Sequence, residues 1–148
     1  MIREATLEDI PAMVEMGQRF ARIDPYKDIL HENPEQMAAM GTSLIESESG
    51  IILVLEREGS LIGMIGMVCS PHFISGEMFS GEVFWWVDQE HRGNGVRLMK
   101  AAEKWSREHG AKTMQMIAPT ERVGRLYTRM GYFPTEISFQ KDLVEKDI

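Results

Sequence analysis

The chain has little of several features that define whole classes of protein. Its 148 residues contain one cysteine, Cys69, so no intrachain disulfide can form. The four histidines and this cysteine show no spacing typical of metal ligands, so we expect no metal. No apolar run approaches the length of about 18 residues that a membrane span needs, and no signal peptide opens the sequence. We therefore expect a cytoplasmic protein with no membrane partner.

Basic residues are fewer than acidic ones and are unevenly placed. The formal net charge of −7 argues against a nucleic-acid partner, which usually needs a basic surface. Residues 1–86 hold 5 of the 16 Lys and Arg but 14 of the 23 Asp and Glu, whereas residues 91–130 hold 9 basic and 3 acidic residues. The basic region suits a small polyanionic ligand, and the acidic region suits a cationic acceptor. Solvated helix faces that differ in sign are the alternative.

A glycine-rich segment, Arg92-Gly93-Asn94-Gly95-Val96-Arg97, lies between an apolar run predicted as a strand, 83–87, and a predicted helix, 98–109. Such a turn suits a pyrophosphate, because the first N–H groups of a helix lack partners and the helix dipole favours negative charge. The glycines would let the backbone approach phosphate, and Arg92 adds a fixed positive charge. An ordinary glycine turn is the alternative, because short glycine motifs are weak signals.

Two well-known phosphate-binding loops are absent from the sequence. No GxxxxGK[ST] occurs, which argues against a P-loop. The glycine-rich segment also lacks the third glycine of the dinucleotide-binding fingerprint, so that kind of cofactor is disfavoured.

Apolar periodicity predicts a single α/β domain over residues 1–148, with a mixed central sheet flanked by helices. The predicted elements are a strand at 2–6, helices at 10–21 and 33–45, strands at 51–56, 61–68 and 77–87, a helix at 98–109, a strand at 113–117, a helix at 123–130 and a strand at 132–141. Glu58-Gly59 is predicted to form a hairpin turn, and residues 22–32 a loop.

Two motifs in this element order resemble the GNAT family of acyl-CoA-dependent N-acetyltransferases. Arg92-Gly93-Asn94-Gly95 is similar to the family's pyrophosphate motif, and Thr120 to Tyr127, followed by Gly131-Tyr132, is similar to its second signature. The resemblance covers essentially the whole chain. It implies the GNAT fold, acetyl-CoA as cosubstrate, and direct acetyl transfer to a primary amine of a small molecule or to a protein lysine or N-terminus.

The resemblance also implies which residues bind acetyl-CoA. Backbone groups of Trp85, Trp86 and Val87 would meet the pantetheine arm and the acetyl carbonyl. The pyrophosphate would lie on Arg92, Gly93, Asn94, Gly95, Val96 and Arg97. Two positions depart from the family pattern. Arg97 stands where the motif prefers Gly or Ala, and either crowds the pyrophosphate or adds charge to it; Thr120 replaces an Asn that contacts the pantetheine arm.

Acetyl transfer to an amine requires a base. An alkyl amine has a pKa near 10.4, so freeing it of its proton at pH 7 costs about 4.6 kcal/mol. We predict Glu82 as the base, because the family often places a glutamate on this strand, and alternation puts it on one face with Phe84 and Trp86, where burial would raise its pKa. A solvated glutamate is an equally good interpretation, and Glu77 is a weaker alternative.

The leaving thiolate requires an acid, and Tyr127 is the candidate. It matches the family tyrosine that lies beside the cofactor sulfur, and a phenol can donate a proton to a thiolate. A core tyrosine is the alternative interpretation.

The acceptor side is less determined. In the resembled fold it is walled by the loop at about 20–35, whose Asp24, Tyr26, Asp28 and Glu32 suit a cationic amine; an exposed acidic loop is the alternative. Two other classes of function stay open: a catalytically inactive GNAT-fold module that binds CoA or a protein, and a nucleotide-binding regulator. The strand at 137–141 could pair with the edge of a second copy, which would make a homodimer.

Overall fold

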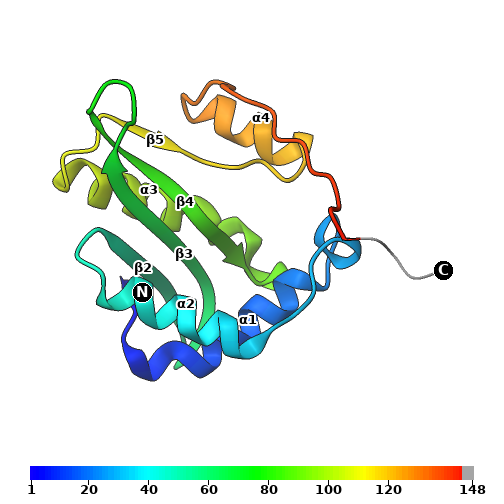
Figure 1. Ribbon diagram of the computed structural model, residues 1–148. Helices are drawn as coiled ribbons and strands as arrows, with labels where there is room; N and C mark the ends of the chain where they lie inside the picture. The colour runs from blue at the N-terminus through cyan, green and yellow to red at the C-terminus, as the bar shows by residue number, and fades with distance from the viewer. Residues whose placement is uncertain (145–148) are drawn as a thin grey trace. The chain divides into compact units, whose positions relative to one another are not determined.

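The structure, a computed structural model, describes residues 1–144 and places five strands in one mixed sheet (Figure 1). The strands are β1 (Ile2–Glu4), β2 (Gly50–Arg57), β3 (Ser60–Pro71), β4 (Met78–Val87) and β5 (Thr113–Gln115). They follow the order β1-β2-β3-β4-β5, antiparallel except for the parallel pair β4–β5. The chain forms two compact units, and the first of them, Met1–Ile117, contains the whole sheet.

Helices cover both faces of this sheet. The helices of the first unit are α1 (Ile10–Ala21), α2 (Pro34–Glu46) and α3 (Gly95–Glu108). On one face, α3 packs Leu98, Ala102 and Trp105 against β2 and β3. On the other face, Met13 and Met16 of α1 and Leu44 of α2 pack against a cluster that includes Trp86 of β4. β2 is buried from Ile51 to Leu55 because both of its faces are covered.

Local chemistry sets several element ends as predicted. The hairpin turn between β2 and β3 has positive φ at Glu58 (52°) and Gly59 (80°), as a two-residue turn requires. Helix α2 begins at Pro34, after Asn33 has accepted a hydrogen bond from the Gln36 backbone N–H at 3.1 Å. Helix α3 is an exception, because it begins at Gly95, three residues earlier than predicted. It directly continues a 3₁₀ helix at Gln89–Asn94.

A β-bulge interrupts the pairing of β3 with β4. Gly66 pairs with Phe84 but Met67 pairs with Glu82, so Val83 is an extra residue on β4. The strict alternation that predicted one shared face for Glu82 and Phe84 is therefore broken at Val83. Phe84 covers Gly66 closely: a Cβ added to Gly66 would lie 2.8 Å from two ring atoms of Phe84.

We expect Gly66→Ala to lower the free energy of unfolding by about 1–3 kcal/mol, because the new methyl group overpacks the core. It would meet Leu44 Cδ2 at 3.0 Å as well as the Phe84 ring. Gly81→Ala is a matched control on β4, where an added Cβ meets nothing within 4 Å. Urea denaturation measures both variants, and equal midpoints would show that Phe84 and Leu44 move aside without loss.

The second compact unit begins at Ala118 and contains α4 (Glu121–Arg129). Thr120 caps this helix, because its Oγ1 accepts a hydrogen bond from the Val123 N–H at 3.3 Å. Gly131, with φ of 95°, follows the end of the helix. The Tyr127 side chain is buried, and its ring centroid lies 5.7 Å from that of Tyr132.

The predicted strand at 132–141 is wrong. Residues 132–143 have no regular secondary structure, and Phe133, Ile137 and Phe139 are 78%, 83% and 94% exposed. The apolar pattern is typical of a strand, but a strand forms only when a neighbouring edge takes up its backbone hydrogen bonds. Residues 137–141, through which a homodimer was predicted, therefore do not form the strand that such pairing would need. The predicted strands at 2–6 and 113–117 are shorter in the structure, at Ile2–Glu4 and Thr113–Gln115.

Candidate active site

Glu82 lies where β4 and β5 separate. The parallel pairing of these strands runs from Phe79 with Thr113 to Gly81 with Gln115, and it ends one residue before Glu82. Beyond that point a side chain connects the two segments: Oε1 of Glu82 accepts a hydrogen bond from the Ile117 backbone N–H at 3.1 Å. The carboxylate is thus fixed at a gap in the sheet by its own strand and by the segment after β5.

Burial raises the pKa of Glu82 to about 7, and the hydrogen bond from Ile117 opposes part of that rise. The direction agrees with the expectation from sequence, although the bulge at Val83 removes the alternation on which that expectation was based. A carboxyl group with this pKa is part ionised at neutral pH, so it can both accept and release a proton there.

Three aromatic rings form a cluster: one from α1, one from the loop after α1 and one from β4. Tyr26 stacks on Phe20 with ring centroids 4.5 Å apart, and Phe20 meets the Trp86 ring edge-on at 5.6 Å. The pKa of Tyr26 is raised by burial first and by the charge of Glu82 second, which places the phenol within the field of the carboxylate. Tyr26 is thus a residue of the predicted acceptor loop whose pKa responds to the charge of Glu82.

Two of the loop's acidic residues are engaged elsewhere. Glu32 accepts two hydrogen bonds from the guanidinium of Arg22, both at 2.8 Å. Asp24 forms an ion pair with Lys27 at 3.4 Å. The acidic character predicted for this loop is therefore partly neutralised by its own cations.

Asp88, just after β4, links this strand to α1, and sequence reasoning missed it. Its Oδ1 accepts from Trp86 Nε1 at 2.8 Å and from Arg19 Nε at 2.9 Å, and its Oδ2 accepts from Arg19 Nη2 at 3.1 Å. Arg19 is on α1, 69 positions earlier, so no local pattern could have revealed the pair. Asp88 and Arg19 join the end of β4 to α1.

Arg92 is held close to the end of β4. Its Nε donates to the Val87 carbonyl at 2.7 Å, and its guanidinium carbon lies 4.8 Å from the Trp86 ring centroid. Arg92 is nevertheless exposed, so its positive charge lies at the surface.

The two glycines of the motif have different roles. A Cβ on Gly95 would lie 3.1 Å from Cζ2 of Trp85, so this buried glycine allows α3 to pack against β4. Gly93 is exposed, and an added Cβ there would meet nothing within 4 Å. A ligand could therefore reach the backbone at Gly93 but not at the buried Gly95. Both glycines were expected to allow this approach.

The surface around Gly93 fits an anionic group. Arg92 and Arg97 are exposed on either side of it, at the N-terminus of the long helix α3. Arg97 Nη1 donates to Asn94 Oδ1 at 3.4 Å, and Asn94 Nδ2 donates to the His91 carbonyl at 3.2 Å. The Arg97 guanidinium thus contacts Asn94 of the segment and adds positive charge beside it.

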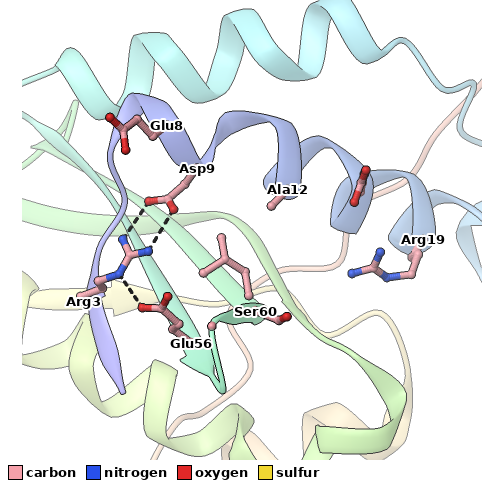
Figure 2. A pocket seen from close by; sticks show the side chains of 10 residues that line it. Arg3, Glu8, Asp9, Ala12, Arg19, Glu56 and Ser60 are labelled. Atoms are coloured by element: carbon pink, nitrogen blue, oxygen red, sulfur yellow. Dashed lines mark hydrogen bonds and ion pairs between the residues drawn. The ribbon is translucent and has the colours of Figure 1, made fainter.

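A separate polar pocket of about 310 Å³ lies beside β1 and α1 (Figure 2). Arg3 is its central cation, with hydrogen bonds to Asp9 at 2.8 and 3.0 Å and to Glu56 at 3.0 Å. Arg3 also holds the pKa of Asp9 below its usual value. Neither Glu82 nor the glycine-rich segment lines this pocket, so it is distinct from the candidate active site.

Residues 1–144 contain neither a cluster of metal-binding side chains nor a membrane-spanning helix. No group of three or more His, Cys, Asp or Glu side chains in this range could hold a metal ion. None of the helices described is long and apolar enough to cross a bilayer.

The sequence matches the acetyltransferase (GNAT) family over residues 15–132, and the chain therefore belongs to this family. The match includes β4, the glycine-rich segment and α4. The predicted GNAT fold is confirmed by this match and by the solved structures that the chain resembles.

Three solved structures show how widely the fold is shared. A transcriptional regulator from Bacillus halodurans C-125 has a TM-score of 0.81 and 18% identity, over 97% of this chain and 99% of that one. A ribosomal-protein-alanine N-acetyltransferase from Brucella melitensis biovar Abortus 2308 has a TM-score of 0.73 and 16% identity, over 97% and 99%. The aminoglycoside acetyltransferase HMB0005 from an uncultured soil metagenomic sample has a TM-score of 0.72 and 17% identity, over 97% and 98%. No curated protein matches the sequence. At these identities, the likeness establishes the fold alone.

Proposed function

We propose that this protein is an N-acetyltransferase that moves an acetyl group from acetyl-CoA directly to the primary amine of an acceptor, either a small molecule or a protein lysine or N-terminus. The observation that carries the proposal is Glu82, a partly buried carboxyl group with a pKa of about 7 at the gap between β4 and β5. Membership of the acetyltransferase family supports acetyl-CoA as the donor.

Glu82 acts as the base, directly or through water. Bound acetyl-CoA would supply the acetyl group, whose bond to sulfur breaks as the acceptor nitrogen forms the amide. An ammonium acceptor loses two protons overall. One leaves through Glu82 to solvent, and the other replaces the proton that the general acid gives to the thiolate. The Ile117 N–H donates a hydrogen bond to Oε1 of Glu82 and so fixes the orientation of the carboxylate while the group takes up the proton.

Tyr127 is proposed as the acid that protonates the leaving thiolate. Its place in the family's second motif supports this role, and burial of its side chain in the α4 unit would limit competition from water. The hydroxyl of Thr120 caps α4, so this residue would support Tyr127 by fixing the helix start in addition to any contact with pantetheine.

Acetyl-CoA is proposed to bind along the end of β4 and the start of α3. Trp85, Trp86 and Val87 would offer backbone groups, because the side chains of Trp85 and Trp86 pack against the two cores. Arg92, Gly93, Asn94, Gly95, Val96 and Arg97 would hold the pyrophosphate, with Gly93 as the point of closest approach and the two arginines as counter-charges.

Calorimetric titration tests the donor site. We expect saturable binding of acetyl-CoA with a dissociation constant in the range of about 1–100 μM, and no binding of ATP at the same concentrations. Gly93→Glu should weaken acetyl-CoA binding about tenfold or more by repelling the pyrophosphate, whereas the equally large Gly93→Gln should weaken it less. A Cβ added at Gly93 meets nothing within 4 Å, and the position is exposed, so both variants should fold.

The titration also separates the other classes of function. Binding of ATP in preference to acetyl-CoA would favour a nucleotide-binding regulator and count against the proposal. Acetyl-CoA binding without thiol release in the presence of any amine would favour a catalytically inactive module.

A further inference from the structure

The loop that contains Tyr26 has less unpaired acidic charge than its composition suggests. Arg22 holds Glu32 with two hydrogen bonds of 2.8 Å, and Lys27 pairs with Asp24 at 3.4 Å. A polycationic acceptor needs several unengaged carboxylates to replace its lost hydration, and these two acids are already matched by cations. The loop is therefore poorly suited to an acceptor with many amines.

The same loop offers aromatic and apolar surface. Tyr26 is half-buried and stacks on Phe20, which in turn contacts Trp86. Ile29 and Leu30 follow in the loop and are 49% and 44% exposed. Flat rings fixed by stacking bind a flat apolar group with little loss of conformational freedom.

From these contacts we infer that the acceptor is a small monoamine with an aromatic body, and that Tyr26 selects it by packing against that body while Glu82 receives the amine. This inference rests on the proposed function, because it specifies the acceptor of the same transfer. The Tyr26–Phe20 pair fixes the ring, and the partly buried Glu82 is the carboxylate left for a single ammonium group. Tyr26 is thus a specificity-determining residue.

The division of charge supports a single amine. Glu82 is close enough to Tyr26 for its charge to affect the phenol, so one ammonium at Glu82 would bring its attached ring to the aromatic cluster. A second ammonium on the acceptor would lie against Tyr26, Ile29 or Leu30. The neighbouring acid, Asp28, is exposed to solvent, where its charge is screened and compensates little for the lost hydration of that ammonium. The arrangement thus discriminates against polyamines and aminoglycosides by leaving their additional charges unpaired.

Steady-state rates of thiol release with saturating acetyl-CoA test this inference. The acceptors are tryptamine and 2-phenylethylamine, with butylamine as a monoamine without a ring, and spermidine and kanamycin as polycations. We expect kcat/KM for tryptamine to exceed that for butylamine and for spermidine by about tenfold or more.

Variants of Tyr26 separate the ring from its hydroxyl. Tyr26→Ala should lower kcat/KM for tryptamine about tenfold and change that for butylamine less than about twofold. Tyr26→Phe, which keeps the stack on Phe20, should retain the preference for tryptamine. Acetyl-CoA affinity and the thermal midpoint of each variant report whether the fold is intact, so a general loss of structure would be distinguished from a loss of selectivity.

Release of one loop carboxylate is the complementary variant. Arg22→Gln removes the partner of Glu32, and we expect kcat/KM for spermidine to rise about threefold while that for tryptamine stays the same. An increase for both acceptors, or for neither, would contradict the role assigned to the neutralised acids.

The failure of this inference can be told from the failure of the proposed function. Turnover that favours spermidine, kanamycin or a peptide amine over every aromatic monoamine overturns the inference and leaves the N-acetyltransferase proposal in place. Equal loss of tryptamine and butylamine turnover in Tyr26→Ala also overturns it. Acetyl-CoA binding without turnover of any amine overturns both.

Discussion

Glu82→Gln will lower kcat/KM for acetyl transfer by about 100-fold to 10,000-fold, the usual contribution of a positioned general base. The variant removes the group that takes the proton but keeps an oxygen that can accept the Ile117 hydrogen bond. The loss of rate therefore separates proton transfer from local structure. Measurement requires only the rates of thiol release with the best acceptor at several pH values.

The pH profile identifies Glu82 as the base more specifically than the rate does. In the unmodified protein, kcat/KM should rise with pH through about 7, as Glu82 loses its proton. This limb should be missing from Glu82→Gln. Glu77→Gln is the matched control, because Glu77 is exposed just before β4 and is the weaker candidate for the same role. If Glu82→Gln keeps full activity and an unshifted acidic limb, Glu82 is not the base.

The stability of the folded protein gives a second readout that needs no substrate. Burial favours the protonated form of Glu82, whose folded pKa of about 7 lies above its ordinary value of 4.5. The contribution of Glu82 to the free energy of unfolding should therefore be most favourable below pH 4.5 and should decrease between pH 4.5 and 7 by up to about 3 kcal/mol. Glu82→Gln lacks this contribution, so its stability relative to the unmodified protein should increase over the same interval.

Tyr127→Phe will lower kcat about 100-fold or more and change acetyl-CoA affinity less than about twofold, because it removes a proton donor without removing the ring. Rapid mixing and steady-state assays together separate the chemical step from product release. Tyr132→Phe is the matched control, since its ring lies 5.7 Å from that of Tyr127 and undergoes the same chemical change.

The outcome for Tyr127 decides between two roles. Unchanged turnover in Tyr127→Phe would show that the residue is a core tyrosine of the α4 unit and that the thiolate leaves without its help. An equal loss in Tyr132→Phe would indicate that the pair of rings matters for packing, in which case the thermal midpoints of both variants should fall together.

Local signals in the sequence predicted most of the elements but not their partners. Asn33-Pro34 and Glu58-Gly59 determine a helix start and a hairpin turn within a few residues, so both were predicted correctly. Residues 132–141 carry an equally clear apolar pattern, but a strand also requires an edge to pair with, and that is a property of the whole fold. The bulge at Val83 escaped prediction for the same reason, since register depends on two strands.

The candidate site shows the same division between local and distant information. The glycine-rich segment is one continuous stretch of sequence, and so is the motif around Tyr127. The family could therefore be identified from each stretch and from their order. The bond of Glu82 to Ile117 and the pair of Arg19 with Asp88 join residues far apart in the chain, and no spacing rule connects them. The pairing of Glu32 with Arg22 neutralises part of the acidic charge of the loop that was predicted to face the acceptor, which composition alone could not reveal.

The contact between Arg92 and Trp86 has a practical consequence. The guanidinium over the indole belongs to the segment that would hold the pyrophosphate, and the indole N–H is fixed by Asp88. Indole emission is sensitive to a nearby charge, so any ligand that draws Arg92 toward solvent alters the light emitted by Trp86. Binding at the proposed donor site can therefore be followed on the unlabelled protein by stopped-flow fluorescence of this tryptophan.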